Sequence, residues 1–188
     1  MLKELIHSDF RRCGITKVTI AVLFRVFFLQ PNPGLKFMTI FRLTQHYRTR
    51  NRPLFYFFFL WLRKYKIKYG FDISYRTSIG SGFYIGHFGG IVIHGDTKIG
   101  NNCNISQGIT IGILNRGRNS GIPTIGDRVF IGPGAVILGG ISIADDALIG
   151  ANAVVNFDVP DKAVVAAPVA QIISNKGSEG YVTVPADK

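Results

Sequence analysis

Isoleucine recurs every six residues through most of the C-terminal two thirds of the chain. The positions form three runs: Ile73, Ile79 and Ile85; then Ile93, Ile99, Ile105 and Ile111; then Ile125, Ile131, Ile137, Ile143 and Ile149. Neither the 3.6-residue period of an amphipathic helix nor the two-residue alternation of a half-buried strand gives a period of six. The repeat therefore predicts short strands joined by regularly spaced turns.

Each six-residue unit fits one side of a three-sided prism. The isoleucine points inward, and the residue four positions later is small or branched because it also points inward near a corner, as at Thr77, Cys103 and Ala135. A glycine often follows the isoleucine, where it can adopt turn conformations that are closed to other residues. Three units close one coil, and successive coils stack about 4.8 Å apart, as neighbouring strands do.

Two breaks in the phase of the repeat predict local departures from the prism. Two extra residues lie between Ile85 and Ile93, and we expect a small bulge at residues 88–90. Between Ile111 and Ile125 there are fourteen residues where twelve would keep the phase. This second segment is polar and rich in glycine, so we expect residues 113–124 to form an extruded loop. Loops on a rigid scaffold often carry substrate contacts.

The N-terminal region, 1–69, lacks the repeat and has a different composition. Proline residues divide it into segments of aromatic and aliphatic residues with interspersed Lys and Arg, which we interpret as helices near 15–29, 35–49 and 53–66. The predicted organisation is a basic, aromatic-rich helical region (1–69), a β-helix domain (70–170) and a C-terminal tail (171–188). The fold class is mainly β with an α-helical N-terminal region.

Charge is distributed unevenly between these regions. The chain carries a net charge of +11, and residues 1–70 hold 14 Lys and Arg but only two carboxylates, Glu4 and Asp9. Basic residues flank an aromatic run within residues 48–68, a pattern that favours contact with an anionic membrane surface. The apolar run from Pro53 to Leu62 is too short to span a bilayer. We expect a cytoplasmic protein, peripheral at the inner face of the cell membrane, and no nucleic-acid partner because no binding motif is present.

The repeat, together with four motifs, resembles the left-handed β-helix acyltransferases, and within them serine acetyltransferases and the exopolysaccharide (colanic acid type) O-acetyltransferases. The resemblance covers Phe71 to Ala170. The motifs are Asp72-Ile73 with Ile79-Gly80, Ile85-Gly86-His87, the segment 105–112, and Ile131-Gly132-Pro133-Gly134-Ala135. It implies a single-stranded left-handed parallel β-helix, a homotrimer, and acetyl-CoA bound in the groove between neighbouring prisms.

The resemblance also implies roles for individual residues. His87 would be the general base that deprotonates the acceptor hydroxyl, and Asp72 would orient it, by the logic of Ser-His-Asp triads. Acetyl-CoA would pass Gly112 and Ala135. Gln107 lies one coil beyond His87, so we expect the two side chains to stack. We therefore assign Gln107 to the residues that contact the acetyl donor.

Three further residues are candidates for substrate binding. Arg116 and Arg118 lie in the predicted loop and could contact an anionic acceptor or the phosphates of CoA, although they could equally be solvated loop charges. His94 follows Ile93 and is expected at the rim of the site. We predict no metal, because His87 and His94 are the only histidines in the predicted prism and a zinc site of the carbonic anhydrase type needs three.

Three departures from the serine acetyltransferase pattern bear on the acceptor. Gly86 stands where that family has Asp before the catalytic His, and Gly121-Ile122 precedes Pro123 where the family has Arg-His. Near the C-terminus, Ala167-Pro168-Val169-Ala170-Gln171 replaces the usual Gly-x-Pro-Ala with a following basic residue, which leaves the CoA phosphate contact unassigned. The groups missing from the first two positions are those that would hold the carboxylate and amine of serine.

These departures favour O-acetylation of a sugar hydroxyl in surface polysaccharide biosynthesis, with a lipid-linked acceptor if the membrane contact exists. Two alternatives stay open at this point. One is a serine O-acetyltransferase in cysteine biosynthesis. The other is a trimeric scaffold without activity, against which the retained His87 argues.

Overall fold

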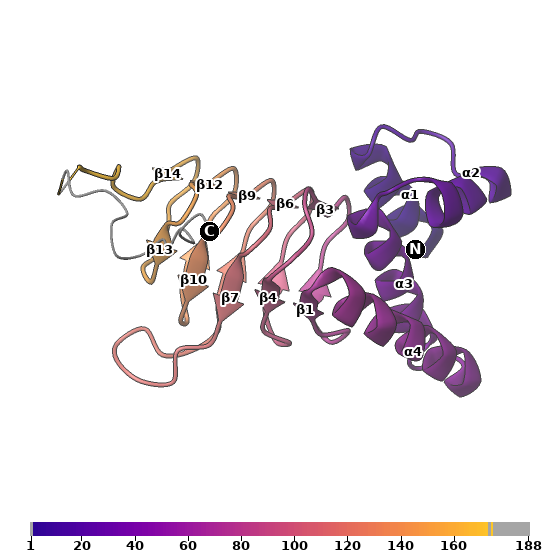
Figure 1. The fold of residues 1–188 in the computed structure, drawn as a ribbon. Coiled ribbons are helices and arrows are strands. Elements are labelled where there is room, and N and C mark those ends of the chain that lie inside the picture. Colours follow the sequence, from indigo (N-terminus) through magenta and orange to yellow (C-terminus); the bar gives the residue numbers. More distant parts are fainter. Residues whose placement is uncertain (1, 173, 175–188) are drawn as a thin grey trace, which may run out of the picture.

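The chain forms a three-sided β-helix with a cluster of helices at its N-terminal end (Figure 1). The computed structural model describes residues 2–172 and 174. The predicted C-terminal tail, 171–188, therefore lies almost wholly outside the described residues. The predicted fold class, a parallel β-helix after an α-helical region, is confirmed by solved structures of the same architecture described below.

Within the described residues, three parallel sheets form the sides of the prism. The first, which we call face A, contains β1 (Phe71–Ile73), β4 (Ile91–Ile93), β7 (Thr110–Gly112), β10 (Val136–Leu138) and β13 (Val154–Val155). Face B contains β2 (Ser78–Ile79), β5 (Lys98–Ile99), β8 (Thr124–Ile125) and β11 (Ser142–Ile143). Face C contains β3 (Tyr84–Ile85), β6 (Asn104–Ile105), β9 (Phe130–Ile131), β12 (Leu148–Ile149) and β14 (Val164–Val165).

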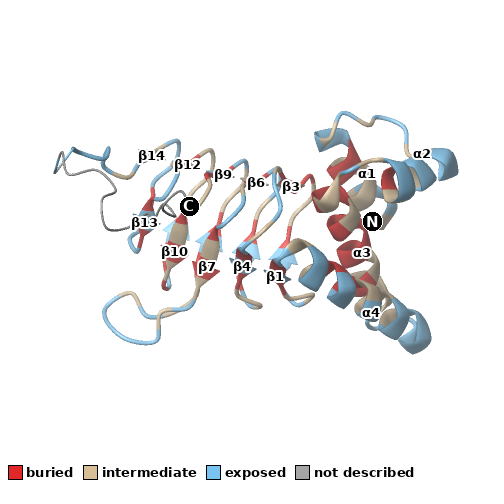
Figure 2. Ribbon diagram, viewed as in Figure 1, coloured by how far each residue is buried: buried red, intermediate tan, exposed pale blue. Residues whose placement is uncertain are grey.

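The repeated isoleucines stack in columns inside the prism. On face C, Ile85 pairs with Ile105 and Ile105 with Ile131, and each of these side chains is at most 5% exposed. The red segments inside the coils in Figure 2 show this buried core running along the prism. The six-residue period therefore encodes the core directly, because every sixth residue points toward the prism axis.

The register locates the two predicted phase breaks. The step from Phe71 to its partner Ile91 is two positions longer than the step from Val92 to its partner Thr110, so the two extra residues lie between β3 and β4. Ile99 pairs with Ile125 across a much longer step, because the segment between β7 and β8 leaves the prism as a loop. The loop is closed by backbone hydrogen bonds in both directions between Leu114 and Gly121.

One corner of the prism depends on left-handed backbone conformations. Gly134 has φ +70°, and a Cβ there would lie 2.1 Å from Oδ1 of Asn152, the residue that occupies the same corner one coil later with φ +57°. Glycine is favoured where φ is positive and neighbouring atoms leave no space for a side chain. This corner is the edge at which each coil enters face A.

Residues 2–69 form four α-helices and one π-helical turn: α1 (Leu2–Arg12), α2 (Ile20–Phe24), η1 (Arg25–Leu29), α3 (Pro33–Tyr47) and α4 (Arg52–Tyr69). The sequence pattern predicted three helices close to the last four elements and missed α1, which precedes the first of them. Asn32 and Asn51 begin α3 and α4: each side chain accepts a hydrogen bond from a backbone N–H, of Leu35 and Leu54 respectively. Gly70, at φ +65°, ends α4 and leads into face A.

The helices cover the open end of the prism. Gly34 of α3 lies so close to β3 that a Cβ there would be 2.6 Å from the carbonyl oxygen of Ile85. The Gln45 amide of the same helix donates to the carbonyl oxygens of Tyr75 and Thr77 at 3.0 Å. Backbone groups of the first coil are therefore satisfied by a helix instead of by another coil. No helix among residues 2–172 and 174 is long and apolar enough to cross a membrane.

Candidate active site

His87 lies at the corner between face C and face A, directly after β3. Its side chain is exposed, and within the described part of the chain it makes no hydrogen bond or ion pair. A cavity of about 270 Å³ lies beside it and is lined by Pro31, Asn32, Pro33, Gly34 and the segment 84–88. An imidazole that is free of partners and faces a cavity can accept a proton from a bound hydroxyl.

The other wall of this cavity comes from the N-terminal region, which the sequence pattern did not connect with the site. Asn32 begins α3 and its Oδ1 accepts a hydrogen bond from Leu35 N at 3.0 Å, so the segment 31–34 has a fixed shape. The close contact of Gly34 with Ile85 holds this segment against β3. The Asn-Pro-Gly signature of a helix start was visible in the sequence, but no motif or spacing indicated that it lies beside His87.

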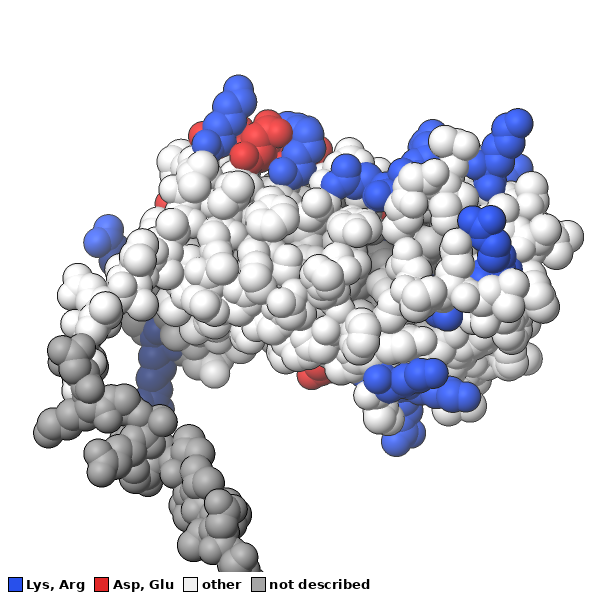
Figure 3. Space-filling model, turned by 45° about the horizontal axis from the view of Figure 1, so that its top comes forward, with Lys and Arg blue, Asp and Glu red and all other residues white. Residues whose placement is uncertain are grey.

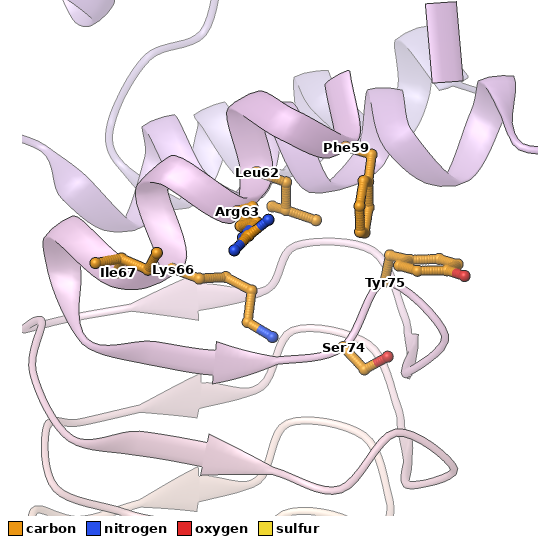
Figure 4. Close-up of a pocket in the computed structure, with 7 residues that line it drawn as sticks. All are labelled: Phe59, Leu62, Arg63, Lys66, Ile67, Ser74 and Tyr75. Atoms are coloured by element: carbon orange, nitrogen blue, oxygen red, sulfur yellow. The ribbon is translucent and has the colours of Figure 1, made fainter. Parts of the chain in front are cut away.

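Asp72 lies on β1, with its side chain on the outer side of face A. Its carboxylate forms an ion pair with Lys66 of α4, with Nζ 2.9 Å from Oδ1, and the Asp72 side chain is 74% exposed. Figure 4 shows Lys66 extending from α4 toward the first coil. Among the described residues no hydrogen bond joins Asp72 to His87, so the structure does not pair the two residues predicted to act together.

The three predicted donor contacts lie on later coils. Gln107 follows β6 and, because β6 pairs with β3, it occupies the corner next to that of His87 on the following coil; its side chain is exposed. Gly112 ends β7 and pairs with Leu138, whereas Ala135 is fully buried in the core and could contact a ligand only through its backbone. Gln107 and Ala135 precede β7 and β10 at the edge where each coil enters face A, and Gly112 ends β7 directly before the extruded loop.

His94 lies at the opposite end of β4 from His87. Its Nδ1 accepts a hydrogen bond from Asp96 N at 3.2 Å, and its carbonyl oxygen accepts from Thr97 N at 3.1 Å. These bonds close the turn between faces A and B. His94 is thus a turn residue in the described structure. No contact there supports its predicted role in substrate binding.

Arg116 and Arg118 lie at the tip of the extruded loop, which projects from the prism between β7 and β8 (Figure 1). Both side chains are exposed, and neither forms an ion pair with a described residue. The base of the loop is held by Asn119, whose amide donates to Asn156 O at 2.6 Å and whose carbonyl accepts from Gly140 N at 2.9 Å. Two guanidinium groups without an ion-pair partner in the described chain are therefore carried on an anchored loop.

Other features of the chain are less suited to catalysis. A cavity of about 360 Å³ between α4 and the first coil is lined mainly by apolar groups, including Phe59 and Leu62, and holds no predicted site residue (Figure 4). Among the described residues there is no group of three or more His, Cys, Asp or Glu side chains that could hold a metal ion. Burial raises the pKa of the Cys103 thiol to about 11, and its Sγ lies 3.1 Å from Gly126 O inside the prism.

Comparison with known proteins matches part of the repeat to a family model. The family model of the bacterial transferase hexapeptide (six repeats) matches residues 122–156. A serine acetyltransferase of Helicobacter pylori is 43% identical over 91 residues, which are 48% of this chain and 53% of that protein. A serine acetyltransferase of Mycobacterium tuberculosis is 42% identical over 108 residues, 57% of this chain and 47% of that protein. The chain thus spans about half the length of the curated relatives it matches.

Solved structures extend the similarity over the helical region. Serine acetyltransferase isoform 3 from Entamoeba histolytica, in complex with cysteine, matches with a TM-score of 0.70 at 29% identity, covering 92% of this chain and 61% of that one. The soybean serine acetyltransferase apoenzyme matches with a TM-score of 0.70 at 27% identity, covering 90% of this chain and 68% of that one. This chain therefore carries a hexapeptide repeat and is similar in sequence and in fold to serine acetyltransferases.

The expectation of a polysaccharide O-acetyltransferase is therefore wrong. It rested on three short departures from the serine acetyltransferase pattern, whereas the identity to serine acetyltransferases extends over 91 to 110 residues in proteins from several bacteria. None of these comparisons supports the exopolysaccharide subtype or a sugar acceptor. The findings support the alternative interpretation of the sequence, a serine O-acetyltransferase, better than the main one.

Proposed function

We propose that this chain is a serine O-acetyltransferase, which transfers an acetyl group from acetyl-CoA to the hydroxyl of L-serine. The observation that carries the proposal is the agreement between two kinds of similarity. The relatives compared in sequence are serine acetyltransferases, and solved serine acetyltransferases also match in structure, with 92% and 90% of this chain covered in the two comparisons above. The exposed His87 beside a cavity supplies the chemistry such an enzyme needs.

His87 is the general base of the proposed reaction. Histidine is the side chain that exchanges a proton most readily near neutral pH. Its imidazole takes the proton of the serine hydroxyl as the hydroxyl oxygen attacks the acetyl carbonyl, and that proton then neutralises the departing thiolate. The thioester of acetyl-CoA supplies the activated acyl group. Base catalysis of this kind contributes on the order of 10² to 10⁴ in rate.

Asp72 is proposed to stabilise the imidazolium that forms on His87. In the described conformation its carboxylate is engaged by Lys66 instead. The Asp72 side chain of that pair is 74% exposed and the Lys66 side chain 30%, so water and salt reach the carboxylate and screen its attraction to Lys66. The carboxylate could therefore be released from Lys66 at small cost when a substrate closes the site.

The acceptor and the donor are proposed to meet between the cavity and the extruded loop. Asn32, which also lines the cavity beside His87, is proposed to contact the polar part of serine. Arg116 and Arg118 supply cations for the serine carboxylate or for the phosphates of CoA, and they can compensate for the Arg-His pair missing before Pro123. Gln107, Gly112 and Ala135 are proposed to line the path of the donor. The lack of bulky side chains at the last two positions fits close passage of a thin, extended arm.

A trimer is part of the proposal. Outward-pointing side chains on face A include Val92 and Val154, and those on face C include Phe130 and Leu148, whereas those on face B are Ser78, Lys98, Thr124 and Ser142. Two faces with exposed apolar side chains and one polar face suit a prism that packs against two neighbours.

We also propose the division into a helical region (1–69) and a β-helix domain (70–170). A cytoplasmic location is proposed because both cysteines are free thiols.

The proposed acceptor is tested by measuring thiol release from acetyl-CoA with L-serine, ethanolamine and 3-hydroxypropionate. Both analogues keep the hydroxyl, but ethanolamine lacks the carboxylate of serine and 3-hydroxypropionate lacks its amine. Turnover with L-serine well above both analogues supports the proposal. Turnover that is equal with all three, or absent with L-serine, contradicts it.

A further inference from the structure

The helical region carries an exposed apolar surface that the proposed reaction does not use. We define it as the aromatic face. It consists of Ile20, Phe24 and Phe28 from α2 and η1, and Phe57 and Leu60 from α4, each between 56% and 87% exposed. Phenylalanine and isoleucine are seldom left so exposed together on one surface, because water disfavours contiguous apolar patches.

Ring contacts show that the aromatic face is continuous across the elements that form it. The rings of Phe24 and Phe28 lie 4.9 Å apart on α2 and η1. Trp61 of α4 connects α4 to η1, because its ring lies 5.7 Å from the ring of Phe27 on η1 and 5.8 Å from the ring of Phe57 on α4. Between the two sides lies an apolar groove of about 350 Å³. The aromatic face is therefore one surface that spans α2, η1 and α4.

Cations surround the aromatic face, and the sequence that forms it has no carboxylates. No Asp or Glu occurs between Asp9 and Asp72. Arg25 on η1 and Lys64 and Lys68 on α4 are exposed and form no ion pair with a described residue. Figure 3 shows Lys and Arg side chains gathered around the helical end of the molecule, whereas the acidic groups visible in that view lie mostly over the prism.

The arrangement on α4 has the spacing of a helix that lies flat on a surface. Phe57, Leu60, Lys64 and Ile67 succeed one another at intervals of three or four residues, and all four side chains are exposed. Aromatic and aliphatic groups flanked by Lys and Arg are the composition that settles at the boundary between lipid headgroups and acyl chains. Duplex nucleic acid would use the cations but would leave the phenylalanines in water.

We propose that the aromatic face docks this chain on an anionic lipid surface, with the phenylalanines inserted at the headgroup boundary and the surrounding cations facing the lipid phosphates. Charge complementarity argues for lipid over a second copy of the chain, because two copies would bring like-charged surfaces together. The aromatic face shares no residue with the cavity beside His87. Docking is therefore independent of which acceptor the enzyme uses.

The test is co-sedimentation of the full chain with vesicles of phosphatidylcholine alone and of phosphatidylcholine mixed with phosphatidylglycerol. We expect binding to the anionic vesicles, reversed by salt. Phe57→Ser should weaken partitioning about tenfold or more, because a buried aromatic side chain is lost from the boundary. Lys64→Gln should weaken it about fivefold. The matched controls are Phe157→Ser and Lys98→Gln, exposed residues on the prism, which should bind as the unmodified chain does.

Two further readouts separate docking on lipid from self-association and from a loss of the fold. Light scattering without lipid should give the same mass for the unmodified chain and for Phe57→Ser. A lower mass for the variant would show that the aromatic face is an interface between copies, and would overturn the proposal. Acetyl transfer in the absence of vesicles should be unchanged in Phe57→Ser. The proposal is also overturned if anionic vesicles bind no protein, or if Phe57→Ser and Phe157→Ser bind equally.

Discussion

Asp9 and Arg42 form a buried ion pair that joins α1 to α3 against the first coil of the prism. Arg42 Nε lies 3.0 Å from Asp9 Oδ2, and both side chains are at most 2% exposed. Arg42 also donates from Nη1 to Ile79 O at 2.6 Å and from Nη2 to Gly80 O, and Asp9 Oδ1 accepts from Phe83 N at 3.0 Å. Two charged side chains thus satisfy polar backbone groups that the prism presents at its open end.

Replacement of one partner should strongly destabilise the fold. Arg42→Met leaves the Asp9 carboxylate buried without a counter-charge, and loss of one partner of a buried pair costs about 3–5 kcal/mol. Burial raises the pKa of Asp9, so part of this loss would be relieved by protonation of the carboxylate at acidic pH. Urea denaturation of Arg42→Met measures the effect. The matched control is Arg76→Met, because Arg76 forms an exposed pair with Asp96 that should contribute less than about 1 kcal/mol. Equal losses in the free energy of unfolding for both variants would show that burial of an ion pair does not determine its contribution to stability.

Gly34→Ala should separate α3 from the first coil and so distort the cavity beside His87. The new Cβ would lie 2.6 Å from Ile85 O, a backbone atom that cannot move without shifting β3. We expect a loss of about 1–3 kcal/mol in the free energy of unfolding, as in other overpacked contacts, and a lower kcat. Gly95→Ala is the control, because its Cβ would meet only the Ser74 side chain at 3.3 Å. A fully active Gly34→Ala variant would show that α3 does not shape the site.

The Cys103 thiol should resist thiol-specific reagents at pH 8 in the folded protein. Burial raises its pKa to about 11, so almost no thiolate is present at that pH. The folded state retains this proton to higher pH than the unfolded state does. The Cys103 contribution to stability is therefore present below pH 9.0 and is lost as pH rises toward about 11. Ellman's reagent, followed with and without denaturant on a Cys13→Ser background, measures the protection. Rapid modification of the folded protein would contradict it.

Arg116→Ser and Arg118→Ser should raise KM without changing stability. Both side chains are exposed and form no ion pair with a described residue, so replacing them breaks no ion pair among the described residues. If they hold the phosphates of CoA, the KM for acetyl-CoA rises about tenfold, as is typical for loss of a charge-assisted hydrogen bond. If they hold the serine carboxylate, the KM for L-serine rises instead. Arg76→Ser is the control, and unchanged constants for both loop variants would remove the loop from the site.

The prism was predictable because the six-residue period of the sequence equals the number of residues on each side of the prism. Ile105, Ile131 and Ile149 succeed one another on one face as the period requires. The extruded loop followed from the break after Ile111, although the number of residues that it adds to the repeat was misjudged. A normal step between faces A and B is a single six-residue unit, as from Ile137 to Ile143, so the loop adds eight residues to that step instead of two.

The site was harder to predict because it is formed by residues distant in sequence. His87 could be recognised from its motif, but the wall formed by residues 31–34 depends on how α3 packs on β3, which no periodicity records. The ion pair of Asp72 with Lys66 depends likewise on the docking of α4. The acceptor was misjudged because three departures at a few positions received more weight than the similarity of the whole repeat.

His87 is proposed to catalyse acetyl transfer to L-serine, and one rate comparison decides whether it does. The rate of O-acetyl-L-serine formation from acetyl-CoA is measured for the unmodified chain, for His87→Ala and for His94→Ala, with the fold of each variant checked by thermal unfolding. We expect a loss of about 10²- to 10⁴-fold for His87→Ala and a much smaller change for His94→Ala, whose ring only closes a turn. An undiminished rate in a folded His87→Ala variant would rule out His87 as the general base.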